Sequence, residues 1–68
     1  MKVEINVNGS IKEVEQGKNL DELVRDLVVT DRGLILELNQ KIIPRDQWKD
    51  HSIREGDKIE LINFVGGG

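Results

Sequence analysis

Residues 34–48 read Leu-Ile-Leu-Glu-Leu-Asn-Gln-Lys-Ile-Ile-Pro-Arg-Asp-Gln-Trp, and this stretch decides what kind of fold the chain can adopt. Its three leucines stand at alternate positions, which predicts a strand that turns one apolar face toward a core. The Asn-Gln pair that follows turns the chain into a short return over residues 41–43. Pro44 stops that return and takes the first position of one tight helical turn that reaches Trp48. A strand that returns on itself at once excludes a strict alternation of strands and crossover helices.

The residues at the N-terminal end predict a hairpin. Residues 2–7 alternate between polar and apolar side chains, as a half-buried strand does. Asn8 and Gly9 follow directly, and both accept the positive φ of a type I′ turn. A second strand is expected from Ser10 to about Val14. Because its two apolar residues have opposite parity, we expect either a bulge or a partly solvated edge strand there.

A helix is expected between the hairpin and the leucine-rich strand. Asn19 stands three residues before Glu22, which resembles a capping box with Asn in place of Ser or Thr. Asp21 and Arg25 are four residues apart and are predicted to pair on the solvent-facing side. Residues 30–33 end the helix. The apolar stripe that faces the sheet consists of Leu20, Leu23, Val24 and Leu27.

The last strand begins at Lys58 and changes character near its end. It first alternates with its apolar residues inward, and then Ile62 and Phe64 place apolar groups on the outward face. The order of elements predicts an α+β roll, with one mixed sheet and one main helix packed across its face. We expect a single domain over residues 1–64 and a flexible glycine-rich tail over residues 65–68.

Composition narrows the range of functions. The chain has 68 residues, a net charge of -3, 37% hydrophobic residues and no cysteine. These values fit one globular domain without disulfides or a thiolate site. The acidic balance argues against nucleic acid and anionic membranes as partners. No apolar run approaches the roughly 20 residues of a membrane span, and the strand-like start does not resemble a signal peptide, so a cytoplasmic location is expected.

The side chains do not predict an enzyme. His51 and Ser52 are adjacent and project in different directions, so they do not form a nucleophile and its base. A domain of this size also has little room for a pocket that excludes water. No metal site is expected, because the acidic residues of the C-terminal half lack the fixed spacing of a calcium loop. These residues are Asp46, Asp50, Glu55 and Asp57.

The main chain itself supplies a reactive group. The α-carboxylate of Gly68, with a pKa of roughly 3.3 to 3.7, is ionised at neutral pH and can attack the α-phosphate of ATP in another protein's active site. Gly66 and Gly67 lack a Cβ and can thread a narrow channel. From Val65 onward, the extended tail reaches about 13 Å beyond the last strand.

Motifs along the whole chain resemble a known family. They are the Asn8-Gly9 turn, the helix from Leu20, the pattern Asn-x-x-Ile-x-Pro-Arg-x-x-Trp over residues 39–48, the turn Glu55-Gly56-Asp57, and the ending Phe64-Val65-Gly66-Gly67-Gly68. Together they resemble the ThiS family of sulfur-carrier proteins of thiamin (thiazole) biosynthesis. The resemblance implies a β-grasp, or ubiquitin-like, fold in which the first and last strands lie side by side and parallel.

The resemblance also implies a sequence of partners. A ThiF-like enzyme would adenylate Gly68, and a persulfide-bearing donor would convert the adenylate into a thiocarboxylate. A ThiG-like thiazole synthase would then accept the sulfur. ATP and magnesium would belong to the activating enzyme, and the chain would be a co-substrate without turnover of its own.

Docking on these partners is expected next to the tail. Ile62, Phe64 and Val65 are the candidate docking residues, with burial of Phe64 under the segment 44–48 as the structural alternative. Trp48 is expected to cover the core. Arg45 is expected as a solvated charge, with contact to an acidic partner surface as the functional alternative.

Three other functions remain open. The small subunit of molybdopterin synthase uses the same tail chemistry, although the Pro-Arg-x-x-Trp stretch favours the thiazole carrier. A ubiquitin-like modifier would form amide bonds with lysines of target proteins. An interaction module with an inert tail would keep its function after loss of Gly67 and Gly68.

Overall fold

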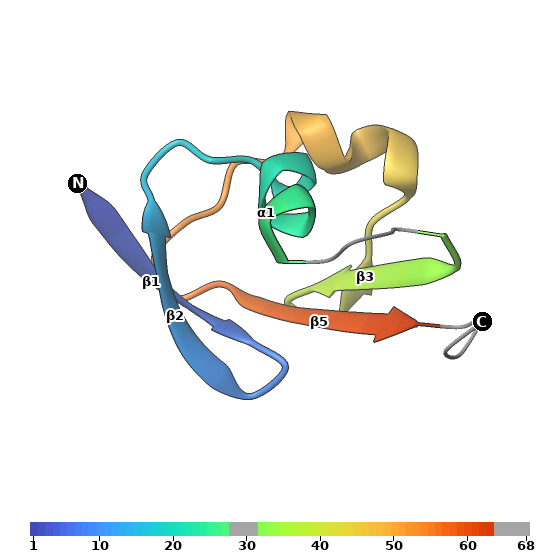
Figure 1. Cartoon of the computed structure of the whole chain (residues 1–68), viewed down its shortest axis with the longest axis horizontal. Coiled ribbons are helices and arrows are strands. Elements are labelled where there is room, and N and C mark those ends of the chain that lie inside the picture. Colours follow the sequence, from blue (N-terminus) through green and yellow to red (C-terminus); the bar gives the residue numbers. More distant parts are fainter. Residues whose placement is uncertain (28–31, 64–68) are drawn as a thin grey trace.

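The computed structural model describes residues 1–27 and 32–63, which form a mixed five-stranded sheet with one main helix across one of its faces (Figure 1). The elements are β1 (Lys2–Val7), β2 (Ser10–Glu15), α1 (Leu20–Leu27), β3 (Leu34–Leu38), β4 (Lys41–Ile42), the 3₁₀ helix η1 (Arg45–Asp50) and β5 (Lys58–Asn63). The expected α+β roll is confirmed. None of the helices in the described ranges is long and apolar enough to cross a membrane.

The first and last strands meet in the middle of the sheet. The strand order is β2-β1-β5-β3-β4, and β1 runs parallel to β5 with Asn6 opposite Lys58 and Val7 opposite Ile59. The other neighbouring pairs are antiparallel. The parallel central pair confirms the arrangement that the family resemblance implied. It also makes the strand that leads toward the C-terminus the central strand of the sheet.

Both hairpins turn through two residues with positive φ. Asn8 and Gly9 have φ values of 51° and 88°, which confirms the type I′ turn between β1 and β2. Asn39 and Gln40, at 51° and 74°, make the corresponding turn between β3 and β4. β2 pairs with β1 without interruption from Lys2–Glu15 to Val7–Ser10, so β2 has no bulge. The alternative expectation, a solvated edge strand, is the correct one.

The core lies between the two helices, α1 and η1, and the face of the sheet that α1 covers. Trp48 is fully buried and its Nε1 donates a hydrogen bond to the carbonyl oxygen of Ile43 at 2.8 Å, which confirms its expected position over the core. Leu27, in the last turn of α1, is exposed and does not belong to the buried stripe. The buried apolar residues are Ile5, Val7, Leu20, Leu23, Val24, Leu36, Ile43, Trp48, Ile53 and Ile59.

Two local expectations need correction. Asp21 was predicted on the solvent-facing side of the helix, yet it is only 5% exposed, because Arg45 of η1 covers it in addition to Arg25. Pro44 precedes η1 as its N-cap residue, with a ψ of 147° that is extended, so it does not occupy the first helical position. The expected helix end over residues 30–33 falls partly outside the described residues.

Candidate functional site

The chain approaches its C-terminus through β5. Asn63 is the last residue of this strand and stands five positions before Gly68. Five of the predicted site residues lie outside the described residues: Phe64, Val65, Gly66, Gly67 and Gly68. The described part of the site is therefore the strand that presents the tail and the surface around the end of that strand.

Two turn asparagines hold β5 from opposite sides. The Oδ1 of Asn8 accepts a hydrogen bond from the Leu61 amide at 2.8 Å, and its Nδ2 donates to the Leu61 carbonyl at 3.3 Å. On the other side, the Oδ1 of Asn39 accepts from the Lys58 amide at 2.9 Å, and the Asn39 amide donates to the Lys58 carbonyl at 2.8 Å. Asn8 thus extends the β1–β5 pairing beyond the point where β1 turns away.

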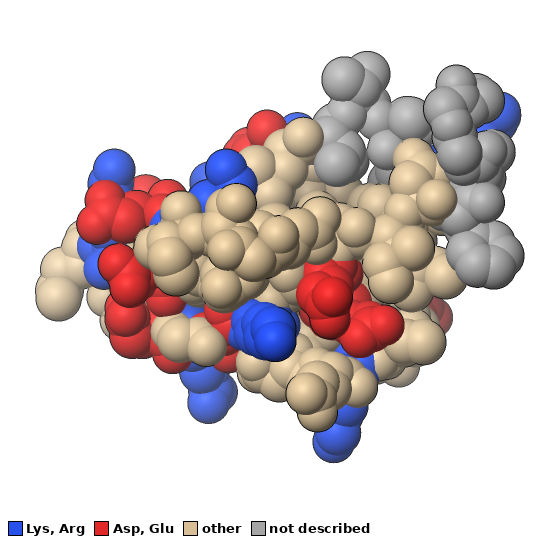
Figure 2. Space-filling view, turned by 90° about the horizontal axis from the view of Figure 1, so that it is seen from below, with Lys and Arg blue, Asp and Glu red and all other residues tan. Residues whose placement is uncertain are grey.

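The sheet face opposite α1 carries the exposed apolar residues near the end of β5. Ile62 is 43% exposed, which confirms its predicted outward position, and it lies directly opposite Ile35 of β3. Ile42 of β4 is 65% exposed and lies opposite Glu37, on the same face as Ile35. We call Ile35, Ile42 and Ile62 the isoleucine patch. Figure 2 views the molecule from this side and shows uncharged and acidic side chains next to each other on it.

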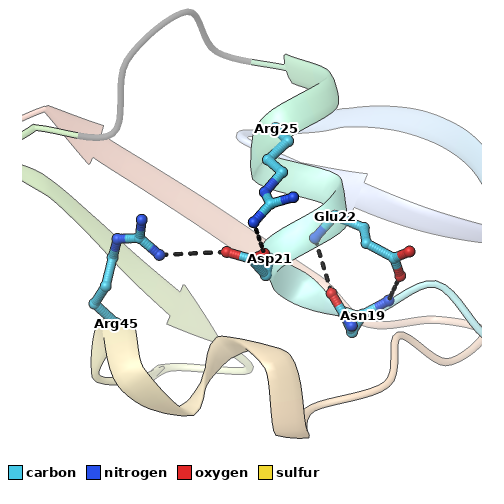
Figure 3. Close-up of polar contacts among 5 residues, drawn as sticks. All are labelled: Asn19, Asp21, Glu22, Arg25 and Arg45. Carbon is cyan, nitrogen blue, oxygen red and sulfur yellow. Dashed lines mark hydrogen bonds and ion pairs between the residues drawn. The ribbon is translucent and has the colours of Figure 1, made fainter.

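Arg45 belongs to the opposite side of the molecule. Its Nη1 lies 3.3 Å from Oδ1 of Asp21 (Figure 3). Its guanidinium carbon lies 4.9 Å from the centre of the Trp48 ring. Asp21 also accepts from Arg25 at 3.1 Å. Since α1 and η1 cover the other face of the sheet, the structure does not bring Arg45 together with Ile62. A docking role for Arg45 stays a prediction.

A capping box fixes the start of α1 beside this ion pair. The Glu22 amide donates to Oδ1 of Asn19 at 2.8 Å, and the Asn19 amide donates to Oε1 of Glu22 at 2.9 Å (Figure 3). The predicted capping box is therefore confirmed. It orients α1 so that Asp21 points toward η1.

The remaining polar candidates do not converge. His51 and Ser52 belong to a segment that pairs with the start of α1, where the Leu20 amide donates to the His51 carbonyl at 3.0 Å and Ser52 bridges to Asn19. Within residues 1–27 and 32–63, no three His, Asp or Glu side chains form a group that could hold a metal ion.

Two members of the isoleucine patch were not identified from the sequence. Ile35 alternates with the leucines of β3, and Ile42 follows the turn into β4. Both lie near Ile62 only because β3 pairs with β5 on one side and with β4 on the other. A usable signal was present, because Ile35 has the outward parity of a strand whose leucines point inward.

Comparisons with known proteins agree with this arrangement. The profile of the ThiS family matches residues 4–68. The sulfur carrier protein ThiS of Escherichia coli (strain K12) is 33% identical over 66 residues, which are 97% of this chain and 100% of that protein. A crystal structure of the thiamine biosynthesis protein ThiS from Geobacter metallireducens has a TM-score of 0.84 at 29% identity, and the match covers 97% of this chain and 100% of that one. The fold is thereby confirmed as a β-grasp.

A longer protein contains a similar segment. The thiazole synthase of Paramagnetospirillum magneticum is 29% identical over 62 residues, which are 91% of this chain and 19% of the synthase. This chain therefore corresponds to about a fifth of that protein's length.

Proposed function

Because this chain belongs to the ThiS family, we propose that it carries sulfur for thiamin biosynthesis on the C-terminal carboxylate of Gly68. The observation that carries the proposal is the family match, which runs from residue 4 through the last residue of the chain. The central position of β5 supports it, because a strand held on both sides is a firm base for a reactive tail.

The proposed chemistry takes place in a partner's active site. The ionised carboxylate of Gly68 attacks the α-phosphorus of ATP, an O–P bond forms, and pyrophosphate leaves. A persulfide-bearing donor then supplies sulfur to the acyl carbon, AMP leaves, and a thiol cleaves the remaining S–S bond. A thiocarboxylate remains on Gly68. ATP and magnesium belong to the ThiF-like adenylating enzyme, and the chain is consumed and regenerated as a co-substrate without turnover of its own.

The acceptor of the sulfur is a ThiG-like thiazole synthase. The similarity of a segment of one thiazole synthase to this chain supports this partner, because it places a carrier-like segment and a synthase in one polypeptide. Gly66 and Gly67 give the tail the backbone freedom to enter the synthase as well as the adenylating enzyme.

Intact-mass spectrometry tests the proposal. The chain is incubated with ATP, a ThiF-like enzyme and a sulfur source, and the expected result is the exchange of one oxygen for one sulfur at the C-terminus. A chain whose C-terminal carboxylate is capped as an amide is the control and should keep its mass. Formation of amide conjugates with other proteins, or an unchanged mass of the intact chain, would contradict the proposal.

Docking is proposed to use the exposed end of β5. Ile62→Asp places a charge on the isoleucine patch and should weaken binding of the ThiF-like enzyme about tenfold, measured by calorimetry. Ile11→Asp is the matched control, since Ile11 is 61% exposed on the same sheet face but on β2. Equal binding by both folded variants would remove Ile62 from the docking surface.

A further inference from the structure

Two acidic residues face each other in the middle of the sheet. Glu37 of β3 and Glu60 of β5 are direct cross-strand neighbours on the face opposite α1. Like charges in this position destabilise a sheet. Neither carboxylate takes part in a side-chain hydrogen bond or ion pair within residues 1–27 and 32–63. The two carboxylates are therefore cross-strand neighbours, and the described part of the chain supplies neither of them with an ion pair.

The isoleucine patch borders this acidic pair on two sides. Glu60 stands two residues before Ile62, and Glu37 stands two residues after Ile35, so the acidic pair and the isoleucine pair are neighbouring rows of one face. Ile42 lies beside Glu37 on the outer strand. Figure 2 shows an acidic group in the middle of this face, with uncharged side chains beside it and Lys or Arg side chains close by.

Lys58 lies on the same face as the acidic pair but forms no ion pair with it. Lys58 stands two residues before Glu60 and therefore shares its face, yet it forms no ion pair with Glu60 or Glu37 within 4 Å. Both carboxylates can therefore accept an ion pair from a cation outside the chain.

We propose that this face docks a protein surface on which an arginine or lysine stands among apolar side chains, with the cation held between Glu37 and Glu60. This inference rests on the proposed function, and the partner to which it applies is the adenylating enzyme. A guanidinium suits two adjacent carboxylates because it offers several donors in a fixed plane. Contact of the isoleucine patch with apolar side chains would exclude water around the charges and strengthen their attraction.

Charge complementarity selects this occupant over others. In a symmetric dimer through this face, the acidic pair of one copy would lie near the acidic pair of the second copy, and the two would repel. Nucleic acid and anionic lipid would be repelled in the same way. A protein surface with a basic and an apolar part complements both the acidic pair and the isoleucine patch.

The chain contains a matched control for the acidic pair. Glu4 of β1 and Glu13 of β2 are also direct cross-strand neighbours on this face, at the other end of the sheet. Glu37→Gln/Glu60→Gln and Glu4→Gln/Glu13→Gln each remove two negative charges from a net charge of -3. Long-range steering therefore changes equally in the two double variants, and only local recognition differs.

Binding of the full chain to the ThiF-like enzyme is measured by calorimetry at several salt concentrations. Glu37→Gln/Glu60→Gln should raise Kd about tenfold and flatten its salt dependence, whereas Glu4→Gln/Glu13→Gln should stay within about twofold of the wild type. The melting temperature of the first variant should equal or exceed that of the wild type, since a repulsion is removed. Equal Kd values for the two variants would overturn the inference.

A second pair of variants tests the apolar half. Ile42→Thr should raise Kd severalfold, and Ile11→Thr, on an equally exposed edge position, should not. In the adenylation assay the acidic-pair variant should show a raised KM with kcat unchanged, because docking precedes the reaction. Tight wild-type binding without thiocarboxylate formation would contradict the proposed function alone. Failure of the wild type to bind would overturn the inference together with its premise.

Discussion

Gln40 holds a backbone conformation that residues with a Cβ rarely adopt. Its φ is 74°, directly after Asn39 at 51°, and the two residues make the turn between β3 and β4. The left-handed region costs an ordinary residue about 1–2 kcal/mol, whereas Asn tolerates it and Gly adopts it freely. Asn39 also uses its side chain to hold Lys58, so the conformational cost falls on Gln40.

Gln40→Gly should therefore stabilise the protein. We expect a gain of about 0.5–1 kcal/mol in the free energy of unfolding, because the relief of backbone strain exceeds the larger entropy that glycine adds to the unfolded chain. Urea unfolding measures the change. Gln40→Ala keeps the Cβ and serves as the control. A loss of stability in the glycine variant would show that the Gln40 side chain contributes more than its backbone costs.

The burial of Asp21 could not be predicted from the sequence. Its spacing to Arg25 predicts an ordinary exposed helix pair, and that pair exists at 3.1 Å. The residue that buries it, Arg45, comes 24 positions later and depends on how η1 packs against α1. Local periodicity carries no information about such a contact. The position of the Arg45 guanidinium over Trp48 is different, because these residues are three apart in η1 and the spacing of a 3₁₀ helix could have predicted it.

At the scale of the element, β5 depends on side chains from two turns. Asn8→Asp tests this: aspartate keeps the acceptor for the Leu61 amide but replaces the donor to the Leu61 carbonyl with an oxygen. We expect a loss of about 1–2 kcal/mol in unfolding free energy and faster hydrogen exchange at the Leu61 amide. Ser10→Ala, at the neighbouring position of the hairpin, is the control. An unchanged unfolding free energy would show that the hydrogen bond from Asn8 Nδ2 to the Leu61 carbonyl does not stabilise the end of β5.

The hairpin turns were predictable, whereas the contacts of their side chains with β5 were not. Asn-Gly signals the first turn by itself, because few other residue pairs accept two positive φ values. That Asn8 also bonds to Leu61, 53 positions away, follows from the parallel pairing of β1 with β5. The alternation of each strand fixes its inward face but not its neighbour in the sheet.

An ion pair between Lys18, which precedes α1, and Asp26, in the last turn of α1, has a defined pH dependence. The side-chain hydrogen bond with Asp26 is the main cause that raises the pKa of Lys18 above its ordinary value of 10.5. Because the pKa is higher in the folded state, the contribution of this pair is fully present below the unfolded pKa and is lost as the pH rises through the folded pKa. Asp26→Asn should therefore lower the urea midpoint near neutral pH and have a smaller effect above pH 10.5. If Asp26→Asn lowered the urea midpoint equally at neutral and at alkaline pH, this assignment would be wrong.

At the scale of the whole molecule, stability rests on one small core. A domain of 68 residues has an unfolding free energy of about 3–10 kcal/mol, so one large buried side chain is a substantial part of it. Trp48→Ala should lower the unfolding free energy by about 3–5 kcal/mol. Trp48→Phe should lower it by about 1–2 kcal/mol, because Phe keeps an aromatic ring in the core but loses the hydrogen bond to the Ile43 carbonyl. Circular dichroism during urea unfolding measures both. Equal midpoints for the wild type and Trp48→Ala would refute this role of Trp48.

The candidate site was only partly predictable at this scale. Ile62 was correctly placed on the outward face because alternation along β5 suffices for that. The isoleucine patch and the pair of Glu37 with Glu60 require the order of β5, β3 and β4 in the sheet, which a single strand does not encode. The chemistry proposed for Gly68 was predicted without any structure, because it depends on a main-chain carboxylate and not on the fold, and it stays a prediction.

The central position of β5 has a mechanical consequence. A force applied at the C-terminus acts along this strand, and hydrogen bonds to β1 on one side and β3 on the other resist it together in shear, as do the side chains of Asn8 and Asn39. Separating such a strand requires many bonds to break at once, whereas an edge strand can be peeled off one bond at a time. A tail could thus be drawn into a narrow channel and withdrawn again while the domain behind it stays folded.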